Sequence, residues 1–231
     1  MTSKPGSGTV LIVAILLFLI LITAAVLVYP GGTVVEPHAE EFQFWQNFLS
    51  DLGRMETFAH GSNQASRRFF VPAIILVSAA MGWFFLGLFP LLILKSRQRF
   101  ARTFLITIGV MALSRMGAGL TPWDRVGHLH LFCVQLTFFS GLMLGAMLLQ
   151  ESKEKGSIVA EERPWLKIWV ATQGLYLMLL VTGPFLNIES QAGLYIAAGS
   201  QKILLMIECG VMLRLGWSVE KIKRPGRIRG D

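Results

Sequence analysis

Six long apolar runs, separated by short polar or Pro/Gly-bearing breaks, constrain this chain more than any other feature of its sequence. A helix rises about 1.5 Å per residue, so about 20 apolar residues are needed to cross the roughly 30 Å hydrocarbon core of a bilayer. We therefore predict an all-α integral membrane protein, in which a single domain over residues 1–231 forms a bundle of six transmembrane helices. The predicted spans are residues 9–29, 69–94, 100–120, 122–149, 165–186 and 194–217.

The composition agrees with lipid as the main solvent of this chain. Of its residues 53% are hydrophobic and 15% charged, against about 25% charged in soluble domains. The net charge of +7 resides mainly in segments that flank the spans, so we expect membrane lipids as partners and no nucleic acid. The first run exceeds the apolar core of a cleaved signal peptide and has no clear A-x-A site, which favours a retained helix over a signal peptide.

Lys and Arg residues are distributed unevenly over the two sides that six spans define. Fifteen of the 21 lie on the side of the two chain ends, and two lie within spans. The remaining four lie on the opposite side: Arg54, Arg67, Arg68 and Arg125. Because short loops rich in Lys and Arg stay in the cytoplasm, both termini are predicted to be cytoplasmic. Residues 218–231 then form a basic cytoplasmic tail, and residues 30–68 form an extracytoplasmic loop.

The long loop contains its own periodic pattern. Phe42, Trp45, Leu49 and Leu52 recur at helical spacing, and polar residues fill the other side. This pattern predicts a short amphipathic helix that lies on the outer membrane surface or caps the bundle, with Gly53 at its end.

Charged residues within the spans are the first candidates for a functional site. Arg115 and Lys202 lie one to two turns below the outer ends of their spans, and Glu208 lies near the middle of the last span. Charges at such depth are costly, so they face the bundle interior, pair with each other or reach the interface. A purely structural ion pair of Glu208 with Arg115 or Lys202 is the alternative. The predicted ligand-binding residues are Arg115, Lys202, Gln201, Gln135 and Glu208.

A second group of candidates lies at the outer ends of the spans, where the topology also places every histidine. Asp124, His128 and Gln135 have the spacing of one helical stripe, whereas His130 points nearly opposite to His128. A carboxylate beside an imidazole fixes its tautomer or raises its pKa, which suits a proton acceptor or a metal ligand. Asp124 has an alternative role as a helix cap. The catalytic candidates are therefore Asp51, Asp124 and His128. We expect no cofactor; the alternative is a zinc ion, for which the candidate ligands are His128, His60 and Asp51.

The fourth span also contains Gly141 and Gly145 in a G-x-x-x-G pattern. Such a pattern lets helices approach closely. It favours contact with a membrane-protein partner or with a second copy of the chain.

Several of these residues, in this order along the chain, resemble a known family. The segments are Asn47 to Gly53, then Asn63 and Ser66 to Phe69, Leu120-Thr121-Pro122 followed by His128 or His130, and Gln201-Lys202-Ile203. Together they resemble the membrane family called domain of unknown function 998, over nearly the whole chain. The resemblance implies a six-helix protein of a prokaryotic inner membrane and strengthens Asp51 and the Thr-Pro to His segment as site candidates. It implies no reaction.

Three hypotheses for the function follow from these features. The first is a non-enzymatic membrane protein with an outer polar pocket for a lipid headgroup or a small anion, held by Arg115 and Lys202. The second is a metal-dependent intramembrane hydrolase built on His128. The third is a proton-coupled transporter that uses Glu208, although no internal repeat supports it.

Overall fold

The computed structural model describes residues 6–182 and 190–223, and six helices in these ranges are long and apolar enough to cross a membrane. The described residues form no strand. The predicted all-α fold with six candidate membrane spans is therefore confirmed. The helices are α1 (Ser7–Leu27), α2 (Gln64–Leu88), α3 (Gln98–Leu120), α4 (Trp123–Glu151), α5 (Arg163–Thr182) and α6 (Gln191–Lys223). Three short 3-10 helices are η1 (Leu49–Gly53), η2 (Phe89–Leu91) and η3 (Leu94–Ser96).

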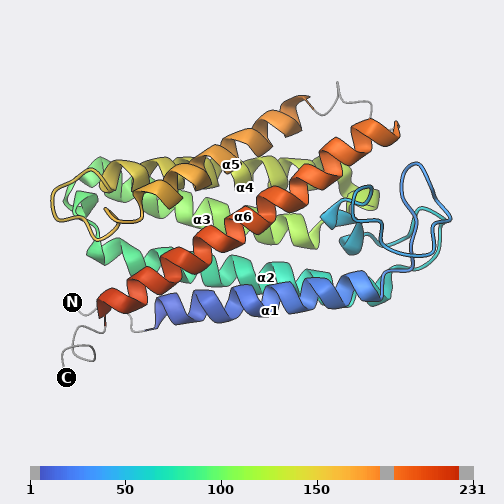
Figure 1. The fold of residues 1–231 in the computed structure, drawn as a ribbon, viewed down its shortest axis with the longest axis horizontal. Coiled ribbons are helices and arrows are strands. Elements are labelled where there is room, and N and C mark those ends of the chain that lie inside the picture. Colours follow the sequence, from blue (N-terminus) through green and yellow to red (C-terminus); the bar gives the residue numbers. More distant parts are fainter. Residues whose placement is uncertain (1–5, 183–189, 224–231) are drawn as a thin grey trace.

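The two ends of the bundle differ in how they are closed (Figure 1). Residues 28–63, which we call the cap, cover the end of the bundle where α1 finishes and α2 begins. We call this end the capped end. The first turn of α1 and the last turns of α6 meet at the opposite, terminal end, where the Glu220 carboxylate accepts the backbone N–H of Gly8 at 3.1 Å. Helix α6 runs obliquely across the bundle and contacts both α1 and α5.

Some helix boundaries depart from the predicted spans for local reasons. Helix α2 begins at Gln64 rather than at residue 69. It ends at Leu88 rather than at residue 94, because the ring of Pro90 prevents a regular α-helix and the chain continues as η2. Helix α6 continues past residue 217 to Lys223. Residues 183–186 of the fifth predicted span and residues 224–231 of the predicted basic tail lie outside the described residues.

Close packing of apolar side chains holds the helices together. Phe85 of α2 stacks on Trp169 of α5 with ring centroids 5.7 Å apart. The G-x-x-x-G pattern of α4 is used within the chain, because a Cβ on Gly141 would lie 2.6 Å from Gln173 Oε1 and one on Gly145 would lie 2.9 Å from Val170. This face of α4 is thus occupied by α5, and an oligomer formed through it stays an untested prediction.

The prediction of an amphipathic helix from Phe42 to Leu52 is wrong. The only helical part of this segment is the 3-10 helix η1, which begins at Leu49. Two of the polar residues expected to face solvent, Gln46 and Asn47, are buried instead. The Asn47 side chain accepts the backbone N–H of Gln43 and donates to the carbonyl of Gly32, and Gln46 accepts a hydrogen bond from the Thr33 hydroxyl. The bond to the nearby Gln43 backbone competes with a continuous helix, and the bonds to Gly32 and Thr33 hold the segment against the start of the loop. Gly53 does end η1, where a Cβ would collide with the Phe70 ring.

Candidate functional site

A buried ion pair joins α3 to α6 inside the bundle. Arg115 Nη2 lies 2.8 Å from Glu208 Oε1, and the two side chains are 12% and 4% exposed. Arg115 Nη1 also contacts the sulfur of Met81 at 3.0 Å. At about 1.5 Å per residue, Arg115 lies roughly 8 Å below the Leu120 end of its helix. The pairing that sequence reasoning offered as an alternative is therefore present, with Arg115 rather than Lys202 as the partner.

The ion pair borders a cavity of about 110 Å³ that extends toward the cap. Most of the wall is apolar, with Phe18, Phe70 and Phe138 among its aromatic members. A cavity of this size has room for several water molecules or for a polar group of similar volume. Its polar lining residues come from the cap and from four helices: Ser50, Arg115, His130, Thr137, Tyr176, Gln201 and Glu208.

These polar groups retain hydrogen-bonding capacity beyond the bonds that they make to one another. Only one Glu208 oxygen is paired, and Oε2 has no partner among the described residues. The Tyr176 hydroxyl accepts from Gln201 Nε2 at 2.9 Å, which leaves its own hydrogen free to be donated. The Arg115 guanidinium has five N–H donors, of which two are engaged. The cavity therefore presents donors and acceptors together, around a charge pair that is neutral overall.

Residues Gln201 and Lys202 of α6 hold the cap in place above this cavity. Gln201 Oε1 accepts the backbone N–H of Leu49 at 2.7 Å. Lys202 Nζ donates to the carbonyl of Asn47 at 2.6 Å and also to the carbonyl of Ala198. Lys202 is buried but does not line the cavity. The ammonium group of Lys202 fastens the loop, so this arrangement does not support the prediction that Arg115 and Lys202 jointly face one ligand, which stays untested.

Asp51 is buried within the cap itself and does not face the cavity. Its carboxylate accepts the backbone N–H of Phe48 at 2.8 Å and the side-chain amide of Asn47 at 3.1 Å. Burial raises the pKa of Asp51 to about 6, against the opposing effects of the Asn47 bond, Arg54, the Phe48 amide and Lys202. These contacts give Asp51 a structural role in shaping the turn.

The predicted stripe of Asp124, His128 and Gln135 does not form. Val126 has φ −136° and ψ 48°, a kink that breaks the regular helical register between Asp124 and His128. Asp124 instead accepts the backbone N–H groups of Met55 and Glu56, which ties the loop to the start of α4. Its alternative role as a helix cap is not observed, because no side-chain hydrogen bond caps the start of α4. His128 is exposed, and Gln135 is half-buried without lining the cavity.

The histidine of the cavity is His130, which sequence reasoning did not choose. Its Nδ1 lies 2.8 Å from the carbonyl of Thr121, and because a carbonyl only accepts, Nδ1 carries the hydrogen. Nε2 is then the acceptor nitrogen of the neutral ring. The Thr121-Pro122 step is the sequence signal that could have pointed to His130. A helix that begins after Pro122 leaves the Thr121 carbonyl without a helical partner, so a nearby side chain must donate to it.

The candidate zinc ligands are not gathered into one site. His60 and His128 are both exposed, whereas Asp51 is buried in the cap. Among the described residues, no group of three or more His, Cys, Asp or Glu side chains is placed to hold a metal ion. The metal-dependent hydrolase stays a prediction that this arrangement does not support.

In the part of the chain that the structure describes, fold and site define a helical protein with six candidate membrane spans and a polar cavity under a loop cap. The chain matches no protein-family model, and comparisons with curated proteins and with solved structures find no match. The resemblance to the family called domain of unknown function 998 thus rests on its motifs alone. Most of those motif residues lie at the capped end, where Asn47, Asp51, Asn63, Gln201 and Lys202 form one hydrogen-bonded region.

Proposed function

We propose that the protein binds the polar headgroup of a membrane lipid in the cavity beneath its cap. The observation that carries this proposal is the Arg115–Glu208 pair, which borders a cavity with mostly apolar walls. The pair leaves Glu208 Oε2 without a partner among the described residues, so an acceptor remains available beside the cavity. A neutral pair with unused donors and acceptors suits a zwitterionic or hydroxyl-bearing headgroup, whereas a free anion would have to compete with Glu208 for the guanidinium.

The proposal is tested by filling the cavity without removing any polar group. Ala118 lines the cavity on α3, and Leu113 of the same helix is 70% exposed. We expect native mass spectrometry to show one co-purifying lipid fewer on Ala118→Phe than on the wild type and on the control Leu113→Phe. Equal lipid retention by Ala118→Phe would overturn the proposal. Release of inorganic phosphate in place of a lipid would also overturn it, because it would identify a small anion as the ligand.

Proton-coupled transport is the second candidate function, favoured by the position of Glu208 near the middle of α6 with one unpaired oxygen. In proteoliposomes, Glu208→Gln is expected to abolish proton-linked uptake while leaving the fold intact. If uptake across a broad substrate screen is unchanged by the substitution, the transport hypothesis is wrong.

We also propose that the protein lies in a prokaryotic inner membrane with both termini in the cytoplasm. The Lys and Arg bias supports this orientation. The meeting of α1 and α6 at one end of the bundle is consistent with it. Cysteine accessibility in intact cells provides the test, with Glu41→Cys reacting from outside and Lys221→Cys protected until the cells are permeabilised. The reverse pattern would invert the topology.

A further inference from the structure

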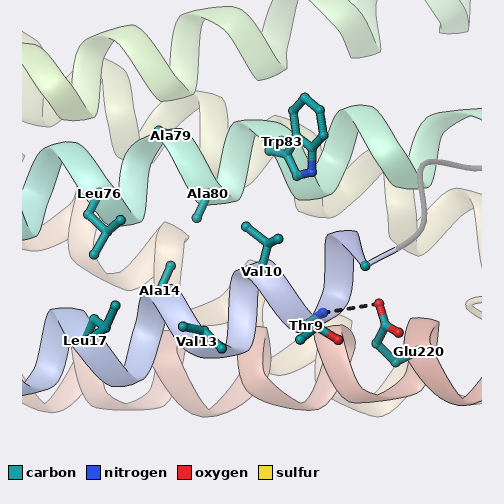
Figure 2. A pocket seen from close by; sticks show the side chains of 11 residues that line it. Thr9, Val10, Val13, Ala14, Leu17, Leu76, Ala79, Ala80, Trp83 and Glu220 are labelled. Carbon is teal, nitrogen blue, oxygen red and sulfur yellow. Dashed lines mark hydrogen bonds between the residues drawn. The ribbon is translucent and has the colours of Figure 1, made fainter.

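A second hollow, separate from the polar cavity, lies between α1 and α2 near the terminal end. It is a groove of about 790 Å³. Figure 2 shows Val10 and Ala14 pointing from α1 toward α2, with Leu76 and Ala80 pointing back from α2. The small alanine side chains leave space that a larger residue would fill. The groove therefore follows directly from the residue sizes on the two facing helices.

The groove is apolar along its length and polar at one end only. Val10, Val13 and Leu17 along its α1 side are 45%, 49% and 42% exposed, as suits a surface in contact with hydrocarbon. Thr9 and Glu220 provide the polar groups at its end (Figure 2). An occupant that complements the whole groove therefore combines an apolar chain with a polar head, and this asymmetry is that of a lipid.

The carboxylate of Glu220 at the polar end of the groove determines which lipid headgroup fits there. Glu220 Oε1 accepts the backbone N–H groups of Gly8 and Thr9 at 3.1 and 3.2 Å. Glu220 Oε2 has no hydrogen-bond partner in the parts of the chain that the structure describes. A primary ammonium group has three N–H donors and a positive charge, so it complements this carboxylate, whereas a quaternary ammonium has no N–H to donate.

We propose that the α1–α2 groove binds one phospholipid, with an acyl chain between the helices and a primary-amine headgroup at Glu220. This site does not depend on the polar cavity. Its headgroup preference comes from Glu220 and its affinity from the groove walls, so the two contributions can be separated by substitution.

The test uses the full chain in nanodiscs containing equal amounts of phosphatidylethanolamine, phosphatidylcholine and phosphatidylglycerol, followed by native mass spectrometry. The wild type should retain one phosphatidylethanolamine in preference to the others. Glu220→Gln keeps an acceptor oxygen for the first turn of α1 but loses the charge. It should reduce that preference about tenfold, the equivalent of one charge-assisted hydrogen bond.

Filling the groove should remove the lipid whatever its headgroup. Ala80→Phe blocks the buried floor, and the milder Ala79→Leu serves if Ala80→Phe does not fold, with Leu113→Phe on α3 as the matched control. Equal retention of all three lipids by the wild type would mean non-selective contact and overturn the proposal. It would also be overturned by a dimeric mass that Ala80→Phe converts to a monomer, because a second copy would then occupy the groove. Ala118→Phe should leave this site unaffected, so failure here is distinguishable from failure of the headgroup cavity.

Discussion

The terminal end and the cavity beneath the cap both contain buried acidic side chains, but their bonding differs. At the terminal end, Glu151 accepts the backbone N–H groups of Ile93 and Leu94, one on each carboxylate oxygen. Glu162 binds the guanidinium of Arg214 through both of its oxygens and also accepts the Ser218 hydroxyl. In the cavity, Glu208 uses one oxygen only. A buried charge by itself therefore does not mark a functional site, whereas unused bonding capacity beside a cavity is the distinguishing feature.

The largest effect should come from splitting the Arg115–Glu208 pair. Arg115→Met leaves the 4% exposed Glu208 carboxylate without its cation, and we expect a loss of about 3 to 5 kcal/mol in the free energy of unfolding. The double variant Arg115→Met with Glu208→Met should recover most of that loss, because it leaves no unpaired charge. Equilibrium unfolding in mixed detergent micelles measures both. A double variant that loses as much as the two single variants combined would show that the pair is not coupled.

The cap should respond to pH through Asp51. Its folded pKa of about 6 lies above the ordinary 3.8, so its contribution to stability is fully present below pH 3.8 and is lost as the pH rises through 6. The total change is about 3 kcal/mol at most. Hydrogen exchange of the Phe48 and Leu49 amides, corrected for intrinsic rates, should accelerate from pH 4 to pH 8. Asp51→Asn should remove this dependence, and slower exchange at high pH in the wild type would contradict the prediction.

Glu151 tests the expectation that a fully bonded acidic residue at the terminal end affects stability but not lipid binding. Glu151→Ala removes the acceptor of two backbone N–H groups, one of them on the buried Leu94, and should cost about 2 kcal/mol of unfolding free energy. Glu151→Gln keeps one acceptor oxygen and should lose about half as much. Lipid retention by native mass spectrometry should not change in either variant. Loss of the cavity lipid from a folded Glu151→Ala protein would remove the distinction between the two regions.

The smallest effect is expected at Tyr176. Tyr176→Phe deletes the acceptor of the Gln201 amide and should cost about 1 kcal/mol in stability. Because the lost hydroxyl also faces the cavity, retention of the cavity lipid should fall more than the stability does. A variant that loses stability but keeps the lipid fully would assign Tyr176 to fastening the cap alone.

The number of helices could be predicted from sequence because each span must satisfy all its backbone hydrogen bonds within itself. That requirement makes apolar length a reliable signal, and the six runs were found with boundary shifts at positions such as Pro90. The cap could not be predicted in the same way. The periodicity from Phe42 to Leu52 suggested a helix, but Asn47 and Gln46 form bonds to loop residues distant in sequence.

The candidate site was predicted in part. Arg115, Gln201 and Glu208 were chosen because charged or polar groups at membrane depth must face the interior, and all three line the cavity. His128 was chosen over His130 by assuming an unbroken helix from Asp124 onward. The kink at Val126 invalidates that assumption, and a backbone irregularity of this kind leaves no mark in the spacing of residues.

The sequence by itself determined that the chain is helical, that it has six apolar segments of membrane-spanning length, and that a few ionisable residues lie within them. Hydrophobicity and helix rise are local properties, so they need no knowledge of neighbours. Only the tertiary structure decided that Glu208 pairs with Arg115, that Lys202 fastens the cap, and that His130 borders the cavity. Those outcomes depend on which helix faces meet and on how many bonds each polar group makes there, which no single segment specifies.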